Sequence, residues 1–241
     1  MRKIRLLCTI MMLTVGVLGC GSDKKDAGSK PEPSSKKEQV SEKETEDLGK
    51  DQSIAEPEET EKTFETGTVN GDVYENEFTG MGYKLNAGWT FYSDDQIREL
   101  NNATGDMMEE EYQKLLENST VIYEMFAVDS EGINNFNVNV EKLNKMQMNN
   151  FDISSNFEQS FPIIESSYEN MGYTDVAYEV GTAVVAGREL DVMYITAEIS
   201  GIPMYQTMFS YRCGQYLVSA CASTFYEDTS AEIFENIYWL D

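Results

Sequence analysis

Histidine is missing from all 241 residues of this chain, and its absence removes several kinds of chemistry. Serine and cysteine nucleophiles are commonly activated by a histidine base, and zinc is commonly held by histidine ligands. Carboxylates, tyrosines, lysines and thiols are the groups that remain for catalysis. The sequence therefore argues against the common hydrolase and zinc-enzyme mechanisms, and we expect neither a metal nor a cofactor.

Basic residues are scarce. The chain has 18 Lys and Arg against 43 Asp and Glu, which gives a formal net charge of -25. From Gly67 to Asp241 the sequence holds 7 of these basic and 29 of these acidic residues. Because phosphate backbones are bound through clusters of Lys and Arg, nucleic acid is excluded as a partner. A partner attracted by the long-range field of this chain would be basic.

Cysteine is also rare, and of the four in the chain only Cys213 and Cys221 lie in the region expected to fold. The segment YRCGQYLVSACAS predicts a hairpin turn at Cys213-Gly214, followed by a strand through Cys221. Eight extended residues span roughly 26 Å, whereas Cα atoms joined by a disulfide lie within about 7 Å. We therefore predict two free thiols, one in a turn and one buried, with a reactive or intermolecular Cys213 as the alternative.

No apolar run is long enough for a membrane-spanning helix, which needs about 20 residues. The longest run, Leu6 to Leu18, follows the basic residues Arg2, Lys3 and Arg5, and these are the proportions of a secretory signal. The run ends in VGVLGCGS, residues 15 to 22. This segment resembles the bacterial lipobox, in which the cysteine is lipidated and the signal is cut just before it.

The lipobox resemblance implies a location and a layout. Cys20 is the expected lipidation site and mature N-terminus, residues 1–19 are the signal peptide, and an ordinary secretory signal is the alternative. Residues 20–66 are rich in Lys, Glu, Ser, Asp and Pro, so we expect a disordered acidic tether. Residues 67–241 are then a single domain in the cell envelope, outside the cytoplasm and anchored to the membrane by lipid.

Strand patterns dominate residues 67–241. In NFNVNVEKL, apolar side chains at 136, 138 and 140 alternate with polar ones at 137, 139 and 141, which is typical of a strand. The other predicted strands are MGYKL and WTFYS on either side of Asn86-Ala87-Gly88, VIYEMFAVDS, DVAYEVGTAVV, RELDVMYITAEIS, MYQTMFSYR and YLVSACAST. Turns are predicted at Ala186-Gly187, Gly201-Ile202 and Cys213-Gly214.

Four helices are predicted. The first is entered at SDDQIREL, where Ser93 and Gln96 have capping-box spacing. The second covers residues 106–118. Residues 155–171 carry apolar side chains at steps of four and three, with Ser155 and Glu158 as the cap and Pro162 inside. The last covers residues 230–240 and begins with Thr229 and Glu232 as its cap pair. Strands joined mostly by hairpins, with helices between them, predict an α+β fold: an antiparallel β-sheet flanked by helices.

The segment YENEFTGMGYKLNAGWTFYSDDQI, the central amphipathic helix, the run of hairpins and the closing helix resemble the Mog1/PsbP-like α/β sandwich of bacterial lipoproteins. The resemblance covers most of residues 73–241. It implies accessory or binding proteins without a shared catalytic motif, so it transfers no functional residue to this chain.

Two functions follow from this sequence. The first is a non-enzymatic, lipid-anchored domain that binds or scaffolds a protein, with a basic envelope protein as the expected partner. The alternative is a small-ligand or glycan binder whose candidate ligand face is Tyr194, Tyr205, Tyr211 and Tyr216, although half-buried packing would also explain these tyrosines. An enzyme ranks third. A pocket with tyrosine and carboxylate at its floor would favour the ligand binder over the protein binder.

Overall fold

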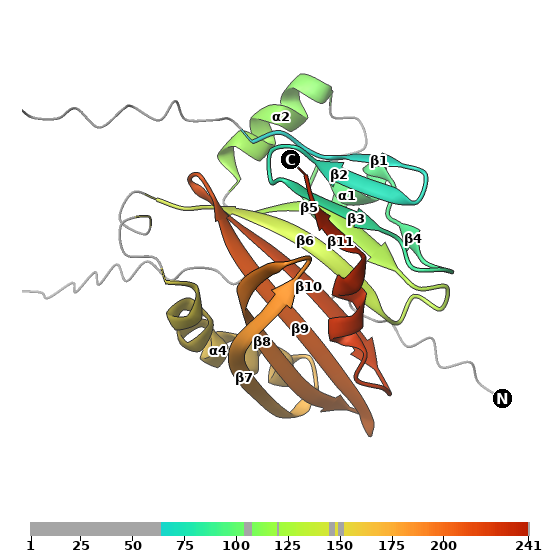
Figure 1. The fold of residues 1–241 in the computed structure, drawn as a ribbon, viewed down its shortest axis with the longest axis vertical. Coiled ribbons are helices and arrows are strands. Elements are labelled where there is room, and N and C mark those ends of the chain that lie inside the picture. Colours follow the sequence, from blue (N-terminus) through green and yellow to red (C-terminus); the bar gives the residue numbers. More distant parts are fainter. Residues whose placement is uncertain (1–63, 104–107, 120, 145–147, 149–151, 241) are drawn as a thin grey trace, which may run out of the picture. The chain divides into compact units, whose positions relative to one another are not determined.

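The computed structural model describes residues 64–103, 108–119, 121–144, 148 and 152–240. The predicted signal peptide, Cys20 and most of the predicted tether lie outside the described residues. Two antiparallel β-sheets and a small number of helices make up the described part of the chain (Figure 1). The predicted α+β class with antiparallel strands is confirmed, although the strands divide into two sheets where one was expected.

The smaller sheet has four strands in the order β1-β2-β3-β11. All of its neighbouring strands run antiparallel. Its strands are β1 (Thr68–Asn70), β2 (Val73–Asn76), β3 (Met81–Lys84) and β11 (Ile237–Trp239). The sheet therefore joins the start of the domain to its end.

The larger sheet has seven strands in the order β4-β5-β6-β10-β9-β8-β7, again all antiparallel. Hairpins connect β5 to β6 and each consecutive pair from β7 to β10. The strands are β4 (Thr90–Phe91), β5 (Val121–Val128), β6 (Asn135–Lys142), β7 (Thr174–Val185), β8 (Arg188–Ile199), β9 (Ile202–Cys213) and β10 (Tyr216–Phe225).

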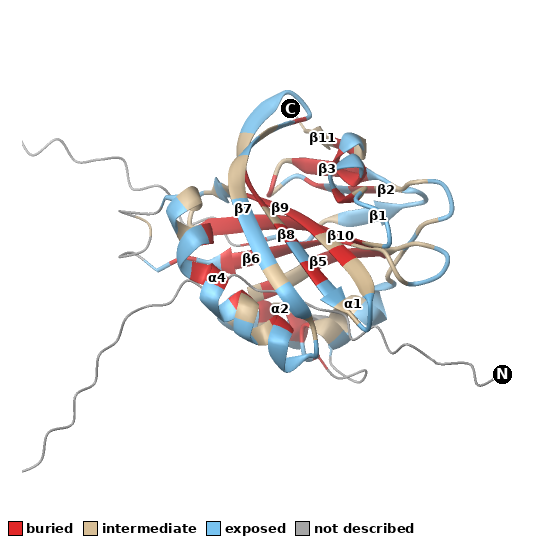
Figure 2. Ribbon diagram, turned by 90° about the horizontal axis from the view of Figure 1, so that it is seen from below, coloured by how far each residue is buried: buried red, intermediate tan, exposed pale blue. Residues whose placement is uncertain are grey.

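Both faces of the central strands of the larger sheet are buried, as the red colour of β6, β9 and β10 in Figure 2 shows. On one face, Phe136, Val138 and Val140 join Tyr74 and Tyr83 of the smaller sheet in one apolar core. The opposite face packs on helix α4 (Ile153–Asn170) in a second core. The alternation predicted for β6 is confirmed, but its polar residues at 137, 139 and 141 are also buried.

Helix α4 carries the predicted apolar stripe, and Phe157, Phe161, Ile164 and Tyr168 are buried. Met171, predicted to continue the stripe, is 40% exposed. The predicted cap was wrong by one turn, because the N-cap is Asp152, whose carboxylate accepts from the backbone N–H of Ser155 at 2.8 Å. An aspartate satisfies the free N–H groups of a first turn as well as a serine does, so the helix begins earlier.

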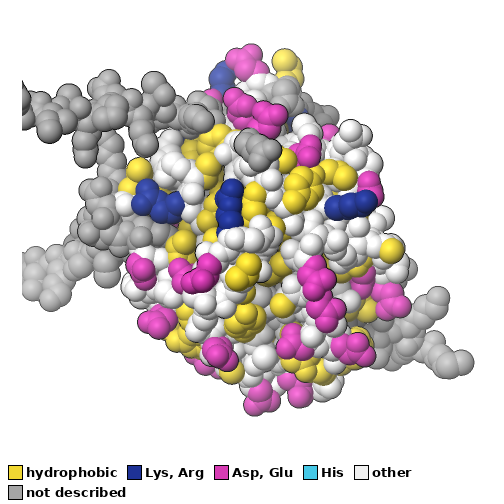
Figure 3. All heavy atoms as spheres, in the orientation of Figure 1, with side chains coloured by type: hydrophobic (Ala, Val, Ile, Leu, Met, Phe, Trp, Pro, Cys, Tyr) yellow, Lys and Arg dark blue, Asp and Glu magenta, His cyan; other side chains and the backbone are white. Residues whose placement is uncertain are grey.

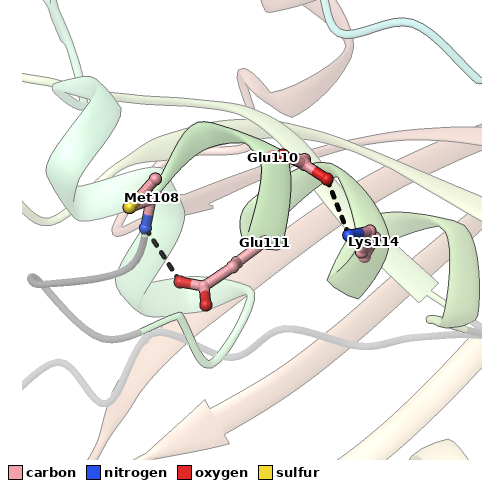
Figure 4. A network of polar contacts seen from close by, with 4 residues as sticks. All are labelled: Met108, Glu110, Glu111 and Lys114. Carbon is pink, nitrogen blue, oxygen red and sulfur yellow. Dashed lines mark hydrogen bonds and ion pairs between the residues drawn. The ribbon is translucent and has the colours of Figure 1, made fainter.

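Helix α1 (Asp94–Leu100) has the predicted capping box, in which Ser93 and Gln96 bond each other's backbone N–H groups. Helix α2 (Glu109–Asn118) agrees with the prediction in type. Its first turn is solvated: the Met108 N–H donates to Glu111 Oε2 at 3.2 Å, and Lys114 pairs with Glu110 at 2.8 Å (Figure 4). Acidic side chains in the first turn stabilise a helix, because they lie at the positive end of its dipole.

The hairpin turns lie within one residue of their predicted positions. Ala186-Gly187 connects β7 to β8 with φ of 48° and 84°. The next turn is Ser200-Gly201, with φ of 54° and 79°, not Gly201-Ile202 as predicted. Two successive residues with positive φ form the turn whose twist matches a two-residue hairpin.

The structure also corrects the predictions for the last helix and its cap, for the strands around the first turn, and for the start of the domain. The last helix is a 3-10 helix, η1 (Ser230–Asn236), and the chain then continues as β11, because pairing with β3 outweighs local helix preference. Thr229 makes no side-chain cap bond there. The strands around Asn86-Ala87-Gly88 belong to different sheets. Phe64, assigned to the tether, is buried against Phe78 and Tyr216, so the folded domain includes it.

The two cysteines of the domain are free. Cys213 ends β9 and is half-buried, and its Sγ donates to the carbonyl of Phe78 at 2.9 Å. Cys221 lies in the middle of β10, opposite Met208, and is buried in the second core. The prediction of two separate free thiols is confirmed, but Cys213 is the last residue of β9 and the turn that follows is Gly214-Gln215, one residue later than predicted.

Candidate functional site

A single acidic residue interrupts the apolar strand β5, and the strand bulges at that point. Tyr123 pairs with Asn139 and Met125 pairs with Val138, so Glu124 between them has no partner on β6. A bulge re-aims one side chain while the rest of the strand keeps its pairing. The Glu124 side chain contacts the smaller sheet and the segment that leads into it.

One oxygen of Glu124 accepts three hydrogen bonds. Oε1 accepts from the Tyr74 hydroxyl at 3.0 Å, from Asn76 Nδ2 at 2.8 Å and from the backbone N–H of Gly67. Asn76 also donates to the carbonyl of Glu65 at 3.1 Å. The carboxylate thus ties β5 of the larger sheet to β2 and to the entry of β1.

The second oxygen of Glu124, Oε2, is buried and has no hydrogen-bond partner among the described residues. The side chain as a whole is 7% exposed. Burial raises the pKa of Glu124, and the hydrogen bonds from Gly67, Asn76 and Tyr74 offset part of that shift. A buried polar atom without a partner costs about 1–3 kcal/mol.

Glu124 lines a pocket of about 180 Å³ between the smaller sheet, α1, α2 and β5. Three tyrosines, Tyr74, Tyr92 and Tyr112, line the same pocket. Apolar contact surface comes from Phe91, Met125 and Phe126, and charge comes from Asp94 and Arg98. The pocket is smaller than most ligand sites, which measure about 300–1,000 Å³, and its lining mixes polar and apolar groups.

The wall formed by α1 is fixed by hydrogen bonds of Asn101. Its side chain donates to the carbonyl of Tyr123 at 2.8 Å and accepts from the Tyr123 N–H at 2.8 Å. It also donates to the Tyr112 hydroxyl at 3.1 Å. The guanidinium of Arg98 lies 4.1 Å from the centre of the Tyr112 ring. These contacts hold the pocket walls in place beside the carboxylate.

The four tyrosines of the predicted ligand face lie apart from this pocket. Tyr216 is buried against Phe64 and Phe78, and Tyr211 donates to the carbonyl of Thr79 at 3.0 Å. Tyr194 packs against the first core, and Tyr205 is half-buried on β9. Their contacts fit the packing alternative, and a role in binding stays a prediction.

Sequence reasoning missed Glu124. The signal was present, since a lone glutamate stands among apolar residues in VIYEMFAV. A charge in a mostly buried strand requires a polar partner. No group of three His, Cys, Asp or Glu side chains placed to hold a metal occurs in the described part of the chain.

No protein-family model matches the chain, and no curated protein sequence matches it. Among solved structures, the chain is similar to the solution structure of cyanobacterial PsbP (CyanoP) from Synechocystis sp. PCC 6803, with a TM-score of 0.44 and 10% sequence identity. The similarity covers 72% of this chain and 98% of that one. Within residues 64–240 as described, no helix is long and apolar enough to span a bilayer.

Proposed function

We propose that this chain is a membrane-anchored lipoprotein located outside the cytoplasm, whose domain binds a small ligand in the Glu124 pocket. The proposed anchor is lipid on Cys20, supported by the basic and apolar residues before it and by the lipobox-like segment. The domain acts by binding and not by catalysis, a role supported by the lack of histidine in the sequence.

The observation that carries the ligand-binding proposal is the pocket itself. Three tyrosines and a buried carboxylate converge there, which is the arrangement that favours a ligand binder over a protein binder. Because three donors hold Glu124 Oε1, the carboxylate is positioned before any ligand arrives. A ligand therefore meets a preorganised site, which lowers the entropic cost of binding.

The lining defines the chemical class of the ligand. The lining carries the carboxylates of Glu124 and Asp94 and the hydroxyls of Tyr74, Tyr92 and Tyr112, so the proposed ligand carries an amino or hydroxyl group that can pair with them. The apolar and aromatic walls, which include Phe91, Tyr92 and Met125, fit an apolar or aromatic part next to that group. The volume of about 180 Å³ restricts the ligand to a compact molecule.

Binding to a protein is the second candidate function, and the charge of the domain favours it. From Gly67 to Asp241 the sequence holds 29 acidic against 7 basic residues, and such a field accelerates association with a basic partner. This role is compatible with the first, because a tethered domain can present a surface to one partner and a pocket to another.

The anchor is tested by replacing Cys20. We expect Cys20→Ala to abolish incorporation of radiolabelled fatty acid and to leave the protein unprocessed or released from the membrane. A mature wild-type N-terminus at any residue other than Cys20 would refute the anchor, whatever the result for the pocket.

The pocket is tested by thermal denaturation with a panel of compact amines and alcohols, each in a form with and without an aromatic group. A ligand at 100 times its Kd stabilises by about 2.7 kcal/mol, which is readily seen as a rise in Tm. We expect Glu124→Gln to abolish the rise caused by the amines, while Glu99→Gln, on the exposed surface of α1, keeps it. If no compound raises Tm, or if both variants respond like the wild type, the pocket is not the binding site.

A further inference from the structure

The larger sheet ends in a long strand that is paired on one side. Strand β7 has 12 residues and pairs with β8. The other sheet edges in the described part of the chain, β1, β4 and β11, are two or three residues long. Long edge strands present unpaired N–H and C=O groups that can pair with another chain, and proteins usually shorten or cover such edges.

Pairing of β7 with β8 is interrupted near one end. The register shifts between Thr174 and Ala177, where Asp175 has a φ of 54°. From Ala177 to Val185 the pairing is continuous, so this part forms a regular edge. At the other end of β7, the carbonyl of Val185 accepts a hydrogen bond from Trp239 Nε1 at 3.1 Å.

The elements around this edge carry many acidic residues and almost no basic ones. From residue 152 to residue 199, which covers α4, β7 and β8, the one basic residue is Arg188, whose guanidinium lies 4.0 Å from the centre of the Trp239 ring. In Figure 3, acidic side chains are scattered over the lower half of the view and no Lys or Arg is seen there; Figure 1 places α4, β7 and β8 in the left part of that half, beside β9 and β10. The acidic residues are Asp152, Glu158, Glu165, Glu169, Asp175, Glu179, Glu189, Asp191 and Glu198.

Exposed apolar side chains gather on the same elements. Val184 on β7 is 70% exposed and Tyr178 is 39% exposed. Ile163 and Met171, inside and at the end of α4, are 42% and 40% exposed. Val184 and the exposed part of Tyr178, whose ring stacks on Phe161 of α4 at 3.8 Å, lie on the strand itself and supply side-chain contacts of the kind that accompany strand addition.

We propose that the edge of β7 from Ala177 to Val185 binds an extended, basic segment of a partner protein by strand addition. The backbone of β7 supplies the hydrogen bonds, and the surrounding carboxylates select lysine or arginine side chains on the incoming strand. This surface is separate from the Glu124 pocket, and the proposal stands without it.

Charge decides between a basic partner and a second copy of this chain. Pairing of two β7 strands would bring together the acidic residues of α4, β7 and β8 of both copies, with Glu179 inside the edge itself. Like charges brought together at an interface oppose association. A basic strand converts the same carboxylates into attractive partners.

The test measures binding of two labelled nine-residue peptides to the full chain in a mild detergent. One, the threonine peptide, alternates lysine with threonine, and the other has the same sequence with a methyl group on every backbone nitrogen. They carry the same charge, but the methylated peptide lacks the N–H groups that strand addition needs. We expect the threonine peptide to bind about tenfold more tightly than the methylated peptide, to weaken as salt rises, and to slow amide exchange at Ala177 to Val185.

A matched pair of variants locates the site. Val184→Lys places a positive charge on the exposed part of β7, and Val69→Lys places the same charge on β1, where Val69 is 48% exposed. We expect Val184→Lys to weaken the threonine peptide about tenfold and Val69→Lys to leave it unchanged. Equal binding of both peptides, equal effects of both variants, or a dimer of the chain that Val184→Lys dissociates would each overturn the proposal.

Discussion

Asn76 Nδ2 donates to Glu124 Oε1 at 2.8 Å, and this bond joins β2 of the smaller sheet to the bulge in β5 of the larger one. Both side chains are buried. The two residues lie 48 positions apart in the sequence. The contact therefore connects the cross-sheet structure of the domain to the pocket that Glu124 lines.

Removing the Glu124 carboxylate should lower the free energy of unfolding more than neutralising it does. Glu124→Leu leaves the Tyr74 hydroxyl, the Asn76 amide and the Gly67 N–H without their shared acceptor, and each unpaired buried donor costs about 1–3 kcal/mol. We expect a loss of about 3 kcal/mol or more in the free energy of unfolding, measured by urea denaturation at pH 7. Glu124→Gln keeps a side-chain oxygen and should lose about 1 kcal/mol or less. Equal stability of the Leu variant and the wild type would contradict this assignment.

Stability should depend on pH through Glu124. Burial raises the pKa of this carboxyl in the folded state, so between the usual glutamate pKa and the raised value the folded chain binds more protons than the unfolded one. Stability from this group is therefore present at low pH and is lost as pH rises through the raised pKa. We expect wild type to lose stability relative to Glu124→Gln over this window in paired denaturation curves. A difference that stays constant with pH, or grows in favour of wild type, would exclude the predicted sign.

Packing should explain Tyr211 better than ligand binding does. Burial raises its pKa, and its hydroxyl donates to the carbonyl of Thr79 at 3.0 Å. Tyr211→Phe should therefore cost about 1 kcal/mol, whereas Tyr205→Phe, on a half-buried side chain, should change stability by less than about 0.5 kcal/mol. Neither variant should affect ligand-induced shifts of Tm. Loss of those shifts in both would restore the predicted tyrosine face.

The two thiols should react at different rates. Burial raises the pKa of Cys221 to about 12, and the thiolate is the reactive form. Cys213 is half-buried. Iodoacetamide at pH 8, with peptides quantified by mass spectrometry, should label Cys213 at least about tenfold faster in the folded protein, and both equally after denaturation. Faster labelling of Cys221 would contradict its burial.

Much of the larger sheet was predictable because its signals are local. Alternation of side chains in β6 and paired turn residues such as Ala186-Gly187 specify hairpins within short stretches of sequence. The apolar stripe of α4 is equally local, since its residues recur every three or four positions.

The smaller sheet and the pocket were not predictable in this way. Strand β11 pairs with β3, whose residues are more than 150 positions away, at Tyr238 and Gly82. Glu124 meets Gly67 across 57 positions and Tyr74 across 50. Sequence periodicity indicates only which face of a helix or strand is buried. It does not identify the distant residue that this face contacts, so these contacts are seen only in the structure.

The central claim is that the Glu124 pocket holds a compact ligand with an amino or hydroxyl group. Its most direct test is to purify the native protein from its host membrane, record its mass under non-denaturing conditions, and identify what is released on unfolding. We predict one small compound of that class on wild type and on Glu99→Gln, and less of it on Glu124→Gln, because the amide oxygen is a weaker acceptor than the carboxylate. Equal amounts of the compound on all three proteins, or none on any of them while the purified domain remains folded, would contradict the account.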